Sequence, residues 1–263
     1  MTLVAVSKFH PVEQLFEAYA AGQRIFGENR PQELAAKVPL MPADVRWHFL
    51  GHLQTNKLKL VLPHAELVHS VDSLRLLEAI DRWGAANGRI IDILLEVHIS
   101  SDATKQGFSP DEVREVLCLK ASSGGAMPSG TRGHPRPDHP KNREIFGDPG
   151  TLPFEGPAGS AGGRGREATV PEGIVPEETE FQAFRHVRVR GLMGMATLTE
   201  NEKQIEGEFA ALKALFDEIK AARPDLTAFD QLSMGMSGDW PIAVRHGATM
   251  VRIGTDIFGA REY

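Results

Sequence analysis

Lys8 is the residue whose position points most directly to chemistry, because it follows the apolar run Leu-Val-Ala-Val at 3–6. Such a run predicts a buried β-strand with Lys8 at its carboxyl end. Partial burial lowers the pKa of a lysine amine and makes it nucleophilic. The alternative is a lysine whose stem packs at the strand end while its amine stays in water. Taken by itself, Lys8 favours this second interpretation.

Two glycine-bearing segments near the other end of the chain suggest a phosphate site. They read SMGMSGD at 233–239 and RIGT at 252–255. Serine hydroxyls and glycine-exposed backbone N–H groups bind phosphate well. The alternative is two ordinary turns, with Ser237 capping the next helix. Because the first segment comes at the end of the seventh predicted strand and the second ends the eighth, the two together favour phosphate.

These residues must be positioned by strands that alternate with helices. Eight apolar runs predict strands, at 2–7, 24–29, 46–51, 66–71, 90–100, 187–195, 229–234 and 250–254. Apolar residues spaced by three and four from Leu74 and from Ile205 predict helices between them. Eight βα units favour a single α/β domain over 1–263, a closed (β/α)8 TIM-type barrel. An open doubly wound sheet is the alternative, although no GxGxxG follows the first strand and no GxxxxGK occurs.

In such a barrel the carboxyl ends of all strands meet at one face, and the loops after strands seven and eight commonly bind phosphate. A nucleophilic lysine facing a phosphate site is the arrangement that pyridoxal 5′-phosphate requires. Seven segments then resemble the pyridoxal phosphate homeostasis protein family, also called proline synthetase co-transcribed proteins. They are AVSK (5–8), FGENRPQE (26–33), WHFLGHLQTNK (47–57), HSVDS (69–73), RGLMGMAT (190–197), LSMGMSGDW (232–240) and MVRIGTDIFGAREY (250–263).

The resemblance implies a fold similar to the N-terminal domain of alanine racemase, and a role for each matching residue. Lys8 would form the Schiff base and Asn29 would lie near the cofactor. Arg252 would face the pyridine nitrogen, and Lys105 would approach the phenolic oxygen. The phosphate would be bound by Ser233, Ser237, Gly254 and Thr255.

The resemblance also implies a function in intracellular pyridoxal phosphate homeostasis, as a carrier or regulator without strong catalysis. Enzymes similar to alanine racemase take their second base from a further domain, for which we see no counterpart after 254. A weak amino-acid racemase is the alternative, and a pure interaction module on a degenerate barrel is a third possibility. The expected partners are the cofactor and apoenzymes that require it, and the expected state is a monomer or weak homodimer.

Composition supports an ordinary globular protein. The 263 residues are 41% hydrophobic and carry a formal net charge of −6, so no basic surplus points to nucleic acid or membrane. The single cysteine, Cys118, excludes a disulfide within the chain. No secretory leader or membrane span is evident, so the cytoplasm is the expected compartment. We expect no metal site, because His48 and His52 lie across a strand end and a loop.

The segment at 122–180 differs from the rest, since its 59 residues hold 12 glycines and 9 prolines. This composition is typical of low complexity. We expect a flexible insertion within the barrel, and a partner-binding arm is the alternative. The chain otherwise offers seven connecting helices for eight strands, so an apolar groove is expected on the outer face between the first and last strands.

Overall fold

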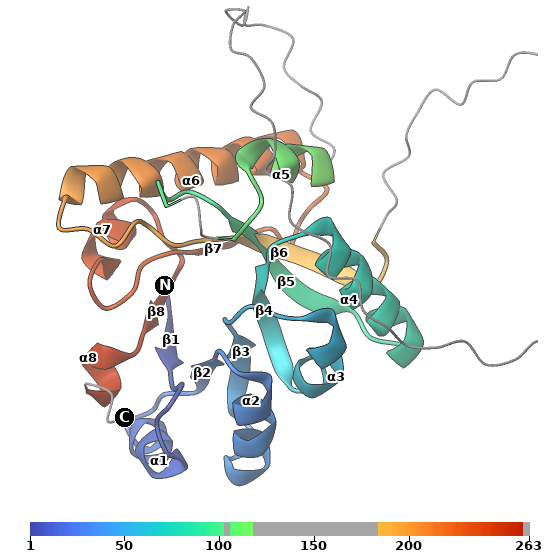
Figure 1. Cartoon of the computed structure of the whole chain (residues 1–263), viewed down its shortest axis with the longest axis vertical. Coiled ribbons are helices and arrows are strands. Elements are labelled where there is room, and N and C mark those ends of the chain that lie inside the picture. The colour runs from blue at the N-terminus through green and yellow to red at the C-terminus, as the bar shows by residue number, and fades with distance from the viewer. Residues whose placement is uncertain (103–105, 118–183, 260–263) are drawn as a thin grey trace, which may run out of the picture. The chain divides into compact units, whose positions relative to one another are not determined.

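The computed structural model describes residues 1–102, 106–117 and 184–259 of the chain. Their eight strands form a closed parallel barrel in the order of the sequence, which confirms the expected fold and excludes the open sheet (Figure 1). All eight expected strands are present, each within two residues of its expected start. They are β1 (Thr2–Val6), β2 (Ile25–Glu28), β3 (Arg46–Phe49), β4 (Ala65–Val71), β5 (Ile91–Val97), β6 (Val187–Gly194), β7 (Gln231–Ser233) and β8 (Met250–Ile253).

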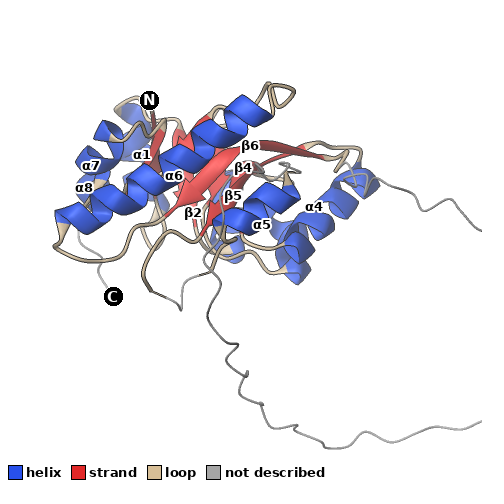
Figure 2. Ribbon diagram, turned by 90° about the horizontal axis from the view of Figure 1, so that it is seen from above, coloured by secondary structure: helices blue, strands red, loops and turns tan. Residues whose placement is uncertain are grey.

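Helices follow the strands and lie around them (Figure 2). They are α1 (Val12–Ala20), α2 (Pro31–Lys37), α3 (Leu58–Val61), α4 (Leu74–Asn87), α5 (Pro110–Val116), α6 (Glu202–Ala222), α7 (Trp240–Arg245) and α8 (Thr255–Phe258), with short 3-10 turns at Val38–Leu40 and Thr55–Lys57. The expected helices from Leu74 and Ile205 are α4 and α6. Ser73 caps α4 by accepting a hydrogen bond from the Leu76 amide.

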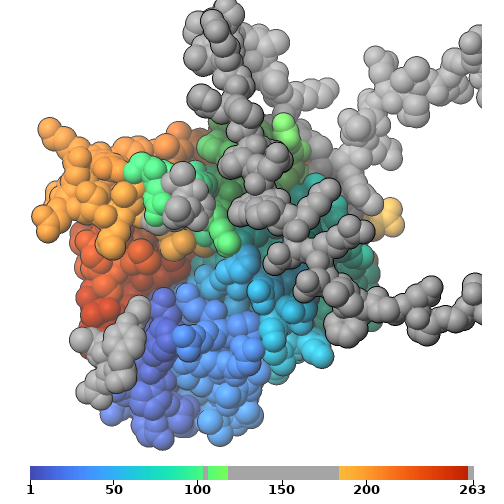
Figure 3. Space-filling view, in the orientation of Figure 1, coloured from blue at the N-terminus to red at the C-terminus, as the bar shows by residue number. Residues whose placement is uncertain are grey.

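Pairing between β1 and β8 closes the barrel. Leu3 pairs with Val251 and Val4 with Arg252, so the first and last strands lie side by side, as the adjoining blue and red regions of Figure 3 show. Since parallel strands all point the same way, their carboxyl ends gather at one face. Lys8, which follows β1, and Gly254, which follows β8, are therefore brought to the same place from opposite ends of the sequence.

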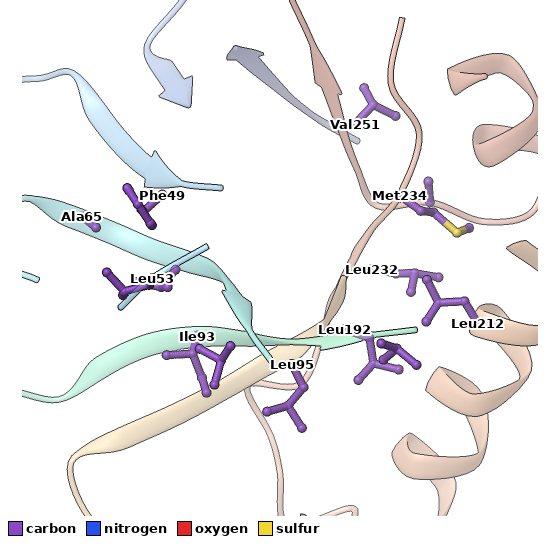
Figure 4. Packing of buried hydrophobic residues seen from close by; sticks show 14 of the residues in the cluster. Phe49, Leu53, Ala65, Ile93, Leu95, Leu192, Leu212, Leu232, Met234 and Val251 are labelled. Carbon is purple, nitrogen blue, oxygen red and sulfur yellow. The ribbon is translucent and has the colours of Figure 1, made fainter. Parts of the chain in front are cut away.

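The barrel has apolar side chains on both faces of its strands. A small inner cluster of Val4, Leu67, Leu94, Met193 and Met250 fills the interior. A much larger outer cluster packs the strands against the helices, as Figure 4 shows for Leu192, Leu232 and Leu212 of α6. Polar interior residues therefore lie above the inner cluster, towards the carboxyl ends of the strands, where they can meet a ligand.

The expected apolar groove between the first and last strands is found only in part. Val251 and Ile253 of β8 are buried, and in β1 only Leu3, with 41% of its surface exposed, matches the expectation. The reason is that β8 packs into the outer cluster together with Ile242 and Ala243 of α7.

Two other expectations concern residues outside the described ranges. The insertion at 122–180 and Cys118 both fall between 118 and 183, so they stay predictions. Within the described ranges, no helix combines the length and the apolar character needed to cross a bilayer.

Candidate functional site

A cavity of about 390 Å³ opens at the carboxyl ends of the strands. Six of the eight residues expected at the site line it, and they come from both ends of the chain. They are Lys8, Asn29, Ser237, Arg252, Gly254 and Thr255. Apolar side chains complete the wall, among them Leu50, Met193, Met195 and Met236. The barrel therefore assembles an amine, a guanidinium and a glycine- and hydroxyl-bearing rim around one volume.

Arg252 forms the charged floor of this cavity. It is 5% exposed, and its Nη1 donates to Ser233 Oγ at 2.7 Å while its Nη2 donates to the Gly194 carbonyl at 3.0 Å. Burial lowers the pKa of the Arg252 guanidinium to about 10, against the opposing charges of Asp239 and Glu96. Arg252 thus stays protonated at neutral pH, and it can only donate hydrogen bonds to a ligand.

Two buried histidines extend the network behind Arg252. His69 Nδ1 lies 3.1 Å from Ser233 Oγ, and His69 Nε2 lies 3.0 Å from His48 Nδ1. Burial lowers the pKa of His48 to about 4 and that of His69 well below its usual range. The low pKa values keep both imidazole rings neutral at pH 7, so an uncharged chain of hydrogen bonds connects His48 and His69 to Ser233, which accepts from Arg252.

Ser233 was expected to bind phosphate, and its position does not support that role. It is fully buried, it is absent from the cavity wall, and its hydroxyl is engaged by Arg252 and His69. The reason is that Ser233 ends β7 on the interior side of the barrel, whereas the cavity rim begins in the loop beyond it. Ser233 thus accepts a hydrogen bond from Arg252 and orients its guanidinium.

The rim loop after β7 is shaped by Gly235 and Asp239. Gly235 has φ +94°, and a Cβ there would lie 2.6 Å from the Ala243 side chain, so only glycine fits. The Asp239 carboxylate accepts from the Met236 amide at 2.6 Å, and Asp239 is the residue that precedes α7. Ser237 therefore does not occupy the capping position considered for it, and it lines the cavity instead.

Gly254 completes the rim from β8. A Cβ at this position would lie 3.2 Å from the Val6 carbonyl oxygen, so the rim packs closely on the end of β1. Gly254 and Thr255 line the same cavity as Ser237 and Gly238. These two loops therefore bring the hydroxyl residues Ser237 and Thr255 and the glycines Gly238 and Gly254 to the same part of the cavity wall.

The side-chain oxygen of Asn29 could accept a hydrogen bond from a ligand. Its Oδ1 is buried and has no hydrogen-bond partner, although Asn29 lines the cavity. An unpaired buried acceptor costs about 1–3 kcal/mol, so a donor on a bound molecule would relieve it. Asn29 is also held closely from behind, since a Cβ on Gly51 would lie 2.1 Å from its carbonyl oxygen. Gly51, in the segment 47–57, must therefore be glycine, because its backbone lies close to the backbone of Asn29.

His48 and His52 do not share a site. His48 bonds His69 inside the barrel, whereas His52 Nδ1 lies 2.9 Å from Asp72 Oδ2. In the described parts of the chain, no group of three or more His, Cys, Asp or Glu residues is arranged to hold a metal ion. Lys105, expected near the cofactor, lies outside the described residues.

Sequence reasoning missed several charged groups beside the cavity. Glu96 lies on the interior face of β5, two residues beyond Leu94, and Lys37 of α2 is buried against Glu28 and Glu33. The signal was present for Glu28 and Glu33, which are part of the segment FGENRPQE. Nothing local to residues 96 or 37 indicates their surroundings.

Comparison with known proteins gives consistent matches. The family model described as the N-terminal domain of alanine racemase matches residues 1–141. The pyridoxal phosphate homeostasis protein of Vibrio alginolyticus is 32% identical over 267 residues, which cover 99% of this chain and 87% of the relative. That of Escherichia coli is 31% identical over 268 residues, with 100% and 87% covered.

Solved structures agree with these relatives. The structure of PipY from Synechococcus elongatus with pyridoxal phosphate bound is 32% identical, has a TM-score of 0.69, and is matched over 98% of this chain and 92% of its own. Alanine racemase from Corynebacterium glutamicum, at 13% identity and a TM-score of 0.55, shares the fold; this chain covers 56% of it.

Proposed function

The chain belongs to the pyridoxal phosphate homeostasis protein family, and from this premise we propose that it binds pyridoxal 5′-phosphate through Lys8 and carries it to enzymes that need it. The observation behind this proposal is the shared cavity that Lys8, Arg252 and the two rim loops line. The Lys8 amine would attack the aldehyde carbon, forming a Schiff base and releasing one water. The cofactor, once bound, supplies an aldehyde and an electron-withdrawing ring.

The residues present suit this cofactor. Its phosphate dianion matches the hydroxyls and amides of the rim at Ser237, Gly238, Gly254 and Thr255. Arg252 supplies a donor on the cavity floor, suited to an unprotonated pyridine nitrogen. The unpartnered Asn29 Oδ1 gives one further polar contact.

Arg252 also favours a carrier over a catalyst. A carboxylate partner would accept a hydrogen bond from a protonated pyridine nitrogen and so make the ring a strong electron sink, whereas a guanidinium with a pKa of about 10 stays charged at neutral pH, can only donate, and disfavours that protonated form. The bound ring would then stabilise negative charge on a substrate carbon only weakly. Binding and imine exchange need no such stabilisation.

The test of this function pairs two measurements on the purified, cofactor-loaded protein. We expect it to reactivate an apoenzyme that requires pyridoxal phosphate, at a rate above that of spontaneous cofactor release. We also expect no exchange of the α-hydrogen of alanine for deuterium, since a carrier leaves that bond intact. Exchange with inversion would instead identify a racemase, and failure to load any cofactor would refute the proposal.

The rim loops give a second prediction. Ser237→Ala is expected to weaken pyridoxal phosphate binding by about 1–3 kcal/mol, the range for a hydrogen bond to a charged group. The same substitution should leave the affinity for pyridoxal, which lacks the phosphate, nearly unchanged. Titration by fluorescence or calorimetry measures both. Equal weakening for the two compounds would show that Ser237 does not contact phosphate.

A further inference from the structure

The turn that carries Lys8 is held in a backbone conformation that side chains rarely adopt. Phe9, the next residue, has φ +68°, and across the described ranges it is the one residue other than glycine with a positive φ. Such a conformation costs on the order of 1–3 kcal/mol and persists where the surroundings enforce it. Neighbouring groups must therefore hold the backbone of this turn in place.

Side chains of α2 hold the peptide groups on both sides of Lys8. Lys37 Nζ donates to the Ser7 carbonyl at 2.8 Å, and the Phe9 amide donates to Glu33 Oε1 at 2.7 Å. Within the turn itself, the His10 amide donates to the same Ser7 carbonyl at 3.1 Å. The backbone is thus fixed immediately before and immediately after the lysine.

These side chains are themselves held in a buried cluster of charges. Lys37 Nζ lies 2.8 Å from Glu28 Oε1 and 2.7 Å from Glu33 Oε1, and the Ser7 hydroxyl donates to Glu28 Oε1 at 2.6 Å. The side chains of Lys37 and Glu28 are 9% and 0% exposed. Buried charges stay in place because losing a partner leaves an uncompensated charge. Lys37 and Glu33 are four residues apart on one face of α2, so a single helix presents both groups.

The residue before α2 adds a further contact with this turn. Arg30, which precedes α2, places its guanidinium 4.3 Å from the centre of the Phe9 ring. One helix and its cap residue therefore contact Ser7 and Phe9 through a cation, a carboxylate and a stacked guanidinium, while Lys8 itself lines the cavity.

We propose that Glu33 and Lys37, supported by Glu28, are positioning residues that fix the backbone around Lys8 and so set where its amine meets the cofactor aldehyde. This inference rests on the proposed function, in which Lys8 forms the Schiff base. A reacting group misplaced by about 1 Å can lose on the order of a hundredfold in rate. The cluster acts on Lys8 through the backbone, since Glu28, Glu33 and Lys37 are not among the residues that line the cavity.

The test compares two variants of similar length at Glu33. Glu33→Gln keeps an acceptor for the Phe9 amide, and Glu33→Met removes it. After mixing with pyridoxal phosphate, visible absorbance follows formation of the Lys8 adduct. We expect Glu33→Met to slow it at least about tenfold, and Glu33→Gln to stay within about twofold of the unchanged protein. Lys37→Met, which removes the bond to Ser7, is the independent second variant and should slow it similarly.

Asp92→Asn is the matched control. Asp92 is 9% exposed and pairs with Arg188 and Arg190 near the amino-terminal ends of β5 and β6. This variant also disrupts a buried charge cluster, so it should lower thermal stability without slowing the adduct. A Glu33→Met rate equal to that of the unchanged protein, or an equal slowing by Asp92→Asn, would overturn the positioning role.

Hydrogen exchange of the Phe9 amide separates this inference from the proposed function. The amide should be protected in the unchanged protein and in Glu33→Gln, and exposed in Glu33→Met, with or without cofactor. If the unchanged protein forms no adduct at Lys8, the proposed function fails. Hydrogen exchange of the Phe9 amide still tests whether Glu33 holds the turn. Equal protection of this amide in all three proteins would overturn the positioning role of Glu33 as well.

Discussion

Lys8→Ala is expected to abolish the visible absorbance that a lysine Schiff base gives to the cofactor-loaded protein, together with all adducts stabilised by borohydride. Lys8 follows β1 and lines the cavity opposite the rim loops, so its loss removes the amine that the aldehyde would meet. The fold should persist with a melting temperature close to that of the unchanged protein, since a half-buried residue at a strand end contributes little packing. Absorbance spectra and mass mapping of reduced peptides measure both effects.

Lys59→Ala is the control for this experiment, because Lys59 is exposed on α3 and absent from the cavity wall. It should retain full absorbance and a reduced adduct on the peptide that contains Lys8. A borohydride-stable adduct on a different lysine in Lys8→Ala would contradict the assignment. Residual non-covalent binding in Lys8→Ala would not, since the rim and Arg252 are intact there.

Glu96→Gln is expected to stabilise the cofactor-free protein in a pH-dependent way. Burial inside the barrel and, to a lesser extent, the Asp72 charge raise the pKa of Glu96 to about 7, although the Arg252 charge opposes them. The folded protein therefore binds a proton that the unfolded chain has lost, and stability falls as pH rises from about 4.5 to 7. A shift of this size corresponds to about 3 kcal/mol above pH 7, since each unit is worth about 1.4 kcal/mol. Glutamine, which never ionises, avoids this loss.

Urea unfolding at pH 5 and pH 8 measures the effect. The stability difference between Glu96→Gln and the unchanged protein should be small at pH 5 and approach the full value at pH 8. Glu115→Gln is the control, because Glu115 is exposed on α5 and its substitution should give no such dependence. A constant difference at both pH values would show that Glu96 does not carry the raised pKa.

Much of the site could be predicted because barrel geometry converts a local pattern into a location. An apolar run ends, a polar residue follows, and every such residue in a parallel barrel must lie at the same face. This reasoning placed Lys8, Ser237 and Arg252 around one cavity although more than 200 residues separate the first from the others. It did not anticipate that Ser233 is buried away from the cavity wall, because one residue along a strand end decides whether a side chain points to the rim or to the interior.

The amino-acid sequence by itself determined the eight strands, their order and the face at which the reactive lysine would lie. Hydrophobic periodicity and turn residues are local properties, and the right-handed βα connection leaves few ways to arrange them. Only the tertiary structure decided which polar groups meet. His69 and Ser233 lie 164 residues apart in the sequence and 3.1 Å apart in the barrel, and Lys37 lies 30 residues from the carbonyl that it holds. A buried charge needs a partner, because desolvation makes an unpaired charged group costly. The fold as a whole decides which residue becomes that partner, however distant it is in the sequence.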